Sequence, residues 1–307
     1  MAEHIKNNIL KTLLYYDIFS HPLSGDEIFT LLSENTVSKD YVYEILKNTA
    51  KETGSTFGER EGYYYVHPNE TNVAKRKLKE AYSKKMWKAA WWITHLIKRF
   101  PFVRAVLVTG SLSKNSSDNK SDLDFMVITA KERLWIARTM LMLFKKIFLL
   151  NSKKYFCINY FITEDYLEIE DKNFFTATEI VHIKATYNTA LVKKFIEANK
   201  WIKEHFPNYI IFDPALHTAG CKAHNRHSIF QQIIEMLVPA GFANRADIKL
   251  MNKTVEHWNR KYSYLDEAER NFRLRSTRSV SKSHPNSVHN VILNSYNEKL
   301  KKFNLKQ

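Results

Sequence analysis

The stretch VLVTGSLSKNSSDNKSDLDFMVIT, from Val106 to Thr129, joins two apolar segments through a Gly-Ser turn and a polar loop. The β-branched run before the turn is typical of a buried strand. Because the chain has only seven glycines, we expect Gly110 to lie where the backbone needs a positive φ or approaches a bulky group. If a helix follows the turn, its free N–H groups would favour a phosphate at this position.

Polar side chains next to the turn would complete a seat for phosphate groups. Ser111 and Ser113 offer hydroxyl donors, and Lys114 offers a positive charge. With Gly110, these are the candidate residues for binding the phosphates of a nucleotide.

Two aspartates lie at the start of the second apolar segment. Strand alternation would place Asp122 and Asp124 on one face, with Leu123 and Phe125 on the other. Their side-chain roots would be about 7 Å apart, since each strand residue advances about 3.3 Å. Carboxylates at this spacing suit Mg²⁺, which substrate phosphates and water also bind. A phosphate seat beside such a pair is what nucleotidyl transfer from a nucleoside triphosphate needs.

This combination resembles the signature of the DNA polymerase β-like nucleotidyltransferases, in which Gly-Ser, a spacer and an acidic–apolar–acidic–apolar run follow a strand. Gly110-Ser111 and the run from Asp122 to Phe125 match that pattern, and the resemblance covers roughly residues 100–205. It implies that Asp122 and Asp124 are catalytic residues that bind Mg²⁺. It also implies that Gly110 and Ser111 hold the triphosphate, and that a third carboxylate follows on a later strand.

The chain departs from the family pattern at that third carboxylate. The next predicted strand, KYFCINYFIT, places Asn159 where an acidic residue is expected. An asparagine can ligate a cation through its carbonyl oxygen but cannot accept a proton as a base. Glu164 and Asp165 follow at the expected strand end and would substitute only if their loop folds back. Asn159 is therefore the third candidate catalytic residue, and its presence leaves catalysis open.

Residues 1–70 have the pattern of a winged helix-turn-helix, with three short helices followed by a hairpin. Ser24 and Glu27 form a capping-box signature before the second helix, and Ser38 is a candidate cap for the third. Such a module binds DNA through its third helix, here around Lys39 and Lys47. Acidic side chains on the same helix instead favour a module that packs on protein.

The remaining chain divides into three further parts. Residues 71–100 read as one basic connecting helix, and residues 101–205 as the nucleotidyltransferase domain. Within that domain the stretch after Asn173 reads as continuous helix, with Asn173 as its candidate cap. Glu179 and His182 lie one turn apart on this helix, either as active-site groups or, as we favour, on a solvated or packing face. Residues 206–307 read as a helical C-terminal extension with a basic tail, which is either solvated or in contact with a nucleic-acid backbone. The expected fold is α/β (α+β), with a mixed sheet flanked by helices.

The composition limits the class of protein. The net charge of +15 fits an anionic partner such as a nucleotide or nucleic acid, although general solubility explains it equally well. Two cysteines give no disulfide framework or metal cluster, as is usual in a reducing compartment. A signal peptide and a membrane-spanning run are both absent from the pattern. We therefore expect a cytoplasmic protein without a membrane partner.

The leading functional hypothesis is Mg²⁺-dependent transfer of a nucleoside monophosphate from a nucleoside triphosphate to a hydroxyl acceptor, with release of pyrophosphate. The acceptor, whether a protein, a nucleic-acid end or a small molecule, stays open. The alternative is a non-catalytic regulator that senses nucleotide or binds DNA through the winged helix. An antitoxin-like protein that modifies or masks a partner is a further possibility.

Overall fold

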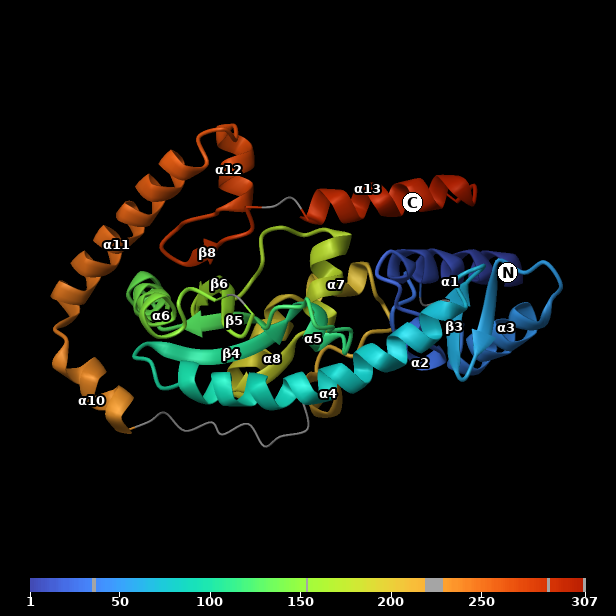
Figure 1. Cartoon of the computed structure of the whole chain (residues 1–307), viewed down its shortest axis with the longest axis horizontal. Coiled ribbons are helices and arrows are strands. Elements are labelled where there is room, and N and C mark those ends of the chain that lie inside the picture. The colour runs from blue at the N-terminus through green and yellow to red at the C-terminus, as the bar shows by residue number, and fades with distance from the viewer. Residues whose placement is uncertain (35–36, 153, 219–228, 286–287, 306–307) are drawn as a thin grey trace.

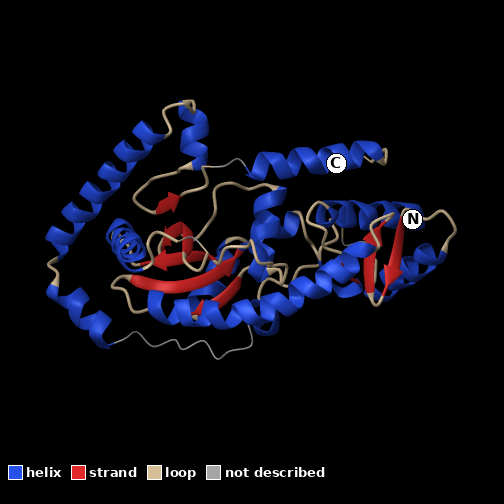
Figure 2. Cartoon of the chain, in the orientation of Figure 1, coloured by secondary structure: helices blue, strands red, loops and turns tan. Residues whose placement is uncertain are grey.

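The structure, a computed structural model, describes residues 1–34, 37–152, 154–218, 229–285 and 288–305. These residues form a mixed α/β protein with one three-stranded and one five-stranded sheet. The small sheet lies in the N-terminal part and the large one in the centre, with helices around both (Figure 1 and Figure 2). The mixed α/β class predicted from the sequence is confirmed. None of the described helices is long and apolar enough to cross a membrane.

The N-terminal part is a compact unit of helices and a small antiparallel sheet. Its elements are α1 (Ala2–Asp17), β1 (Leu23–Ser24), α2 (Gly25–Thr30), α3 (Lys39–Lys51), β2 (Phe57–Arg60) and β3 (Tyr63–Val66). The strand order is β1-β3-β2. Ser24 and Glu27 form the predicted capping box at α2, and the Ser38 side chain caps α3 by accepting from Tyr41 N. The local signals for these helices are therefore confirmed.

One long helix, α4 (Thr71–Ile97), connects the N-terminal unit with the central sheet. Its 27 residues span about 40 Å at 1.5 Å per residue. One side of the helix is buried along its length, from Arg76 through Met86 to Ile97, while the other side faces solvent. Figure 1 shows α4 running from beneath β3 to the underside of β4.

The central sheet has the strand order β7-β4-β5-β6-β8. Its strands are β4 (Val103–Thr109), β5 (Asp124–Thr129), β6 (Cys157–Thr163), β7 (Lys184–Tyr187) and β8 (Val280–Lys282). β5 and β6 are parallel, and the other neighbouring pairs are antiparallel. The antiparallel register of β4 and β5 places Thr109 opposite Asp124. The Gly-Ser turn and the second aspartate therefore lie at the same end of the sheet.

Helices cover both faces of the central sheet. Strand residues such as Val106 and Phe125 share a buried cluster with residues of α4 and of α6 (Leu134–Phe148). On the opposite face, Leu107 and Met126 share a cluster with residues of α7 (Phe174–His182) and α8 (Thr189–Ala198). This second cluster continues into the core of the N-terminal unit. Successive side chains of β4 and β5 point to opposite faces of the sheet, so each face packs against its own set of helices.

The stretch after Asn173, predicted as continuous helix, is interrupted by a strand. The Asn173 side chain caps α7 as expected, but residues Lys184–Tyr187 form β7 and pair with β4. Asn188 then adopts φ 57° and its side chain caps α8. The helical period of the flanking segments concealed a short edge strand, because pairing with a distant strand leaves no local signal.

The C-terminal third contributes to the sheet as well as helices, which the sequence did not suggest. Its helices are η1 (Lys200–Glu204), α9 (Pro214–His217), α10 (Ile229–Leu237), α11 (Ala240–Lys261), α12 (Glu267–Arg273) and α13 (Val288–Lys302). β8 lies at the edge of the central sheet, beside β6. α13 lies along α1, where Lys299 and Asp17 form an ion pair at 2.6 Å. The basic tail is therefore not simply solvated within its described residues.

Candidate functional site

Gly110 and Asp124 meet where β4 ends and β5 begins. Gly110 has φ +67°, which residues with a Cβ rarely adopt. A Cβ at this position would lie 2.5 Å from Asp124 Oδ2 and 3.2 Å from its Cγ. Both reasons expected for a glycine apply, and the bulky group that approaches the backbone is the Asp124 carboxylate. We call the place where this turn meets the Asp124 side chain the Gly110 corner.

Asn159 lies beside this corner because β6 is irregular. The register between β5 and β6 shifts by one residue next to Asn159, and such a bulge re-aims a side chain. The Asn159 Nδ2 donates to Asp124 Oδ1 at 3.3 Å. Cys157, which lies opposite Asp124 in the sheet, donates its thiol hydrogen to the same carboxylate. Asn159 occupies the expected position of a third carboxylate, and it donates a hydrogen bond to the carboxylate of Asp124.

The Asp124 side chain is partly exposed, as that of Asp122 is, but its carboxyl group is strongly desolvated by the surrounding protein. Burial raises its pKa to about 6, and the negative charges of Asp122 and Glu179 add to this rise. Hydrogen bonds from Cys157 and Asn159 act in the opposite direction. Within the described part of the chain, no lysine or arginine forms an ion pair with Asp124. A carboxylate in this environment gains from binding either a proton or a metal cation.

Asp122 was expected to lie on the strand with Asp124, but the structure places it outside the strand. β5 begins at Asp124, so Asp122 belongs to the loop that leads into it. Its side chain is partly exposed, and its charge acts on Asp124. The two carboxylates therefore approach the same region from different backbone positions, one fixed by the sheet and one carried by a loop.

The serines of the turn mostly bind the turn itself. The helix that was expected to follow the turn, α5 (Gly110–Ser113), is a single turn. The Ser113 side chain is buried and its hydroxyl donates to Gly110 O at 2.9 Å. Ser111 Oγ lies 3.0 Å from Ser117 Oγ and is partly exposed. Ser113 is therefore placed to stabilise the turn, whereas Ser111 lies nearer to solvent.

Lys114 directs its ammonium group toward α7, where it forms an ion pair with Glu179. Both side chains are mostly buried, at 15% and 27% exposure. Glu179 also influences the charge on Asp124, so it belongs to the same corner. The sequence placed Glu179 on a helix but interpreted it as a surface or packing residue. Only its partner from the distant turn identifies it as part of the site.

The C-terminal segment forms a further wall of the corner, which the sequence did not suggest. Ser283 N, just beyond β8, donates to Asn159 O at 2.8 Å. The side chain of the next residue, His284, is exposed, and neighbouring protein atoms lower its pKa from the ordinary value. The Lys282 ammonium adds to this lowering, while Glu179 opposes it. His284 therefore lies within electrostatic range of the Glu179 carboxylate.

Glu164 and Asp165, the proposed substitutes for the missing carboxylate, lie at the other end of β6. Asn159 is near the start of that strand, and Glu164 follows its last residue, roughly 16 Å further along at 3.3 Å per residue. Glu164 and Asp165 instead line a surface hollow with two more acidic residues. The negative charge of this hollow opposes a triphosphate. These two residues are therefore remote from the corner.

The described residues do not form a metal site made of protein ligands alone. Among the described residues, no group of three or more His, Cys, Asp or Glu side chains is arranged to hold a metal ion. Mg²⁺ in nucleotide sites is commonly bound by one or two carboxylates together with phosphate oxygens and water. Asp122 and Asp124 fit that smaller donor set.

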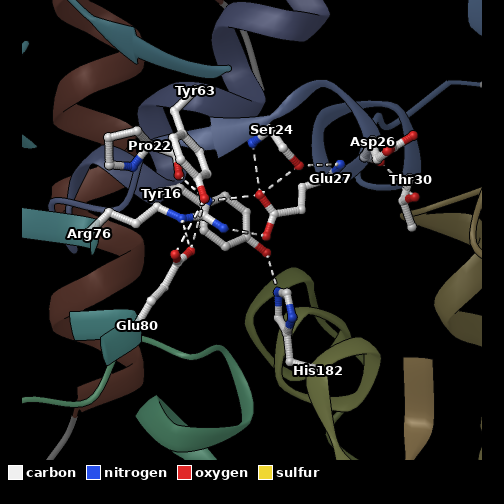
Figure 3. A network of polar contacts seen from close by, with 10 residues as sticks. All are labelled: Tyr16, Pro22, Ser24, Asp26, Glu27, Thr30, Tyr63, Arg76, Glu80 and His182. Carbon is white, nitrogen blue, oxygen red and sulfur yellow. Dashed lines mark hydrogen bonds and ion pairs between the residues drawn. The ribbon is translucent and has the colours of Figure 1, made fainter. Parts of the chain in front are cut away.

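A second cluster of buried charges lies between the N-terminal unit and α7. Figure 3 shows the Arg76 guanidinium between the carboxylates of Glu27 and Glu80. Arg76 donates to Glu27 through two nitrogens, each at 2.8 Å, and to Glu80 through Nε at 2.8 Å. Close by, the Tyr16 hydroxyl and His182 Nε2 of α7 lie 2.7 Å apart. His182, another candidate from the sequence, therefore binds the N-terminal unit instead of the Gly110 corner.

Comparison of the chain with protein-family models, curated proteins and solved structures finds no match. The resemblance to a superfamily therefore stays a prediction from the residues of the motif.

Proposed function

We propose that this chain is a Mg²⁺-dependent nucleotidyltransferase of the DNA polymerase β-like type. The observation that carries the proposal is the Gly110–Asp124 corner, where a desolvated carboxylate, without an ion-pair partner among the described residues, lies against a glycine turn. The fold is compatible, because the mixed sheet presents this corner at the end of two neighbouring strands. The order of elements and the small sheet in residues 1–70 likewise support the winged-helix interpretation.

The residues of the corner divide between the metal and the phosphates. Asp124 and Asp122 would hold Mg²⁺, which would neutralise charge on the triphosphate and on the leaving pyrophosphate. Gly110 and Ser111 would lie against the phosphates, since the turn presents backbone there without a side chain. Lys114 would leave Glu179 and bind a phosphate oxygen, which exchanges one charge-assisted contact for another.

The transfer itself needs an acceptor hydroxyl in line with the leaving pyrophosphate. A bond forms between the acceptor oxygen and the α-phosphorus, and the bond from that phosphorus to the bridging oxygen breaks. The acceptor proton must go to a base, and Asn159 cannot serve as one. Glu179, released from Lys114 by the incoming phosphates, is the carboxylate that we assign to this role.

The same contacts favour a second candidate, a non-catalytic regulator. Asn159 donates a hydrogen bond to Asp124, and Glu179 forms an ion pair with Lys114. The Asp124 carboxylate and the Lys114 ammonium therefore both have protein partners in this state. In this alternative the corner senses nucleotide and the N-terminal unit binds DNA or a partner protein, as in an antitoxin-like protein. Lys39 of α3 is paired with Asp26 at 2.5 Å, which weakens the case for DNA contact through that helix.

Incubation of the full chain with α-labelled nucleoside triphosphates, Mg²⁺ and cell extract tests the proposal. The wild type should transfer label to an acceptor, and Asp124→Ala should reduce transfer by about 10³-fold or more, because the metal supplies several kcal/mol at the transition state. Asp165→Ala, which removes an aspartate at the remote end of β6, is the matched control and should retain full transfer. Label transfer that survives in Asp124→Ala would contradict the proposal, and nucleotide binding without any transfer would favour the regulator.

A further inference from the structure

The solvent-facing side of α4 carries a stripe of positive charge with an exposed aromatic ring. Successive turns of this side present the following exposed residues, here called the α4 stripe: Lys77, Ala81, Lys84, Lys85, Lys88, Trp92 and His95. They recur at intervals of three and four residues, which places them on one face of a helix. Arg99, just beyond the helix end, continues the same line.

The cations in the middle of the α4 stripe are not neutralised. No carboxylate among the described residues pairs with Lys84, Lys85 or Lys88, and α4 itself has no acidic residue after Glu80. Only Lys77, at the N-terminal end, has an acidic partner, Glu61. A row of unpaired lysines on a rigid helix is the electrostatic footprint of a phosphate backbone.

Several basic residues of the C-terminal third are paired with carboxylates. Arg275 and Lys282 both contact Asp171 at 2.8 Å, and Lys299 is paired with Asp17. These three cations are neutralised locally, whereas Lys84, Lys85 and Lys88 of α4 form no ion pair with a described carboxylate.

Trp92 supplies the second feature of the surface. Its side chain is 70% exposed and lies about 12 Å along the helix from Lys84, at 1.5 Å per residue. An exposed indole next to a basic track is an unusual use of a large apolar ring, and it is what single-stranded nucleic-acid sites use to stack bases. Leu78 is the other large apolar side chain that α4 exposes, so the face lacks the apolar area needed to enter a membrane.

The buried side of α4 fixes the location of the stripe. Ser83 Oγ accepts from Ser117 N at 3.1 Å, and Trp87 Nε1 donates to Asn115 Oδ1 at 3.1 Å. Both partners lie in the loop that follows the Gly110 turn. Because this side of the helix is held by the protein, α4 cannot enter a duplex groove, but its outer side is free for a strand to lie along.

We propose that the α4 stripe binds single-stranded nucleic acid, with the backbone along Lys84, Lys85 and Lys88 and a base stacked on Trp92. This binding does not depend on the proposed transfer activity, because it involves no residue of the Gly110 corner. A strand bound there would pass beside the loop after that corner.

Fluorescence anisotropy with a labelled single-stranded oligonucleotide and the full chain tests the proposal. Lys84→Glu/Lys88→Glu should weaken binding at least tenfold, and the slope of log affinity against log salt should become shallower by about 1.4. Lys301→Glu/Lys302→Glu makes the same change in charge on α13, on the other side of the molecule in Figure 1, and should leave that slope unchanged. Equal loss in both variants would show a general charge effect and overturn the proposal.

The role of Trp92 and the kind of partner are tested separately. Trp92→Ala should weaken binding by roughly 5- to 150-fold without changing the salt slope, and Trp92→Phe should restore much of the loss. Unaltered affinity in Trp92→Ala would contradict the stacking contact. A duplex of equal length that binds as tightly, or preferential binding to vesicles of phosphatidylcholine and phosphatidylserine, would also overturn the assignment to single strands. All variants should retain the wild-type circular dichroism spectrum, because the changed side chains are exposed.

Discussion

Two partly buried carboxylates in this molecule, Glu27 and Asp124, experience opposite electrostatic environments. Burial alone would raise the pKa of both. At Glu27 the Arg76 guanidinium outweighs burial and holds the pKa below its ordinary value. At Asp124 nothing of that kind is present among the described residues, and burial raises the pKa to about 6. The first carboxylate is neutralised within the protein, whereas the second has no cationic partner among the described residues.

The difference separates a structural charge from a functional one. The Glu27–Arg76–Glu80 cluster joins elements of the N-terminal unit to α4, and each of its groups has a partner inside the protein. The Asp124 corner has only weak neutral donors, a thiol and an amide. A stable fold gains nothing from leaving a desolvated carboxylate in this condition. The corner therefore fits a site that is completed by a metal–nucleotide complex.

The largest effect on stability is expected at the neutralised cluster. Arg76→Met removes the cation between two carboxylates and should lower the free energy of unfolding by about 3 kcal/mol. Urea denaturation followed by circular dichroism measures this. Arg60→Met is the matched control, because the exposed Arg60–Glu70 pair should contribute only about 0–1 kcal/mol. A cost at Arg76 no greater than that at Arg60 would contradict the structural role of the cluster.

At Asp124 we expect a substitution to change the free energy of unfolding in the opposite direction. Because its pKa in the folded protein is raised to about 6 from the ordinary 3.8, the stability associated with this carboxyl is present below about pH 4 and is lost as pH rises through about 6. Asp124→Asn removes the titration, so this variant should be more stable than the wild type by up to about 3 kcal/mol at pH 7.5. At pH 3.5 the two proteins should differ little.

Thermal unfolding at both pH values measures this difference. Asp122→Asn serves as the comparison, because its side chain lies in a loop and is partly exposed. An Asp124→Asn variant that is less stable than the wild type at pH 7.5 would show that the carboxylate has a cationic partner after all. In that case the contrast with Glu27 would disappear.

The sequence predicted the local features of the site better than the distant ones. The glycine at the turn, the caps at Ser24 and Ser38, and the strand that carries Asp124 follow from residue types at short spacing. The position of Asp122 outside the strand was not predicted, because the alternation of four residues does not show where pairing begins.

Features that depend on contacts between distant segments could not be read from the sequence. β7 and β8 are short, and only their pairing with β4 and β6 makes them strands. Glu179 looked like a surface residue until the fold placed Lys114 beside it. Similarly, the lysines of α4 are distinguished from those near β8 only by the absence of carboxylates around them in the described structure. Pairing of charges is a tertiary property, and composition does not reveal it.

Isothermal titration of a non-hydrolysable nucleoside triphosphate analogue into the full chain, with and without Mg²⁺, tests the central claim most directly. We expect binding that requires Mg²⁺ in the wild type and is lost in Asp124→Asn, while Arg60→Met binds as the wild type does. Binding that is equally tight without Mg²⁺, or unchanged in Asp124→Asn, would contradict the claim that this carboxylate is completed by a metal–nucleotide complex.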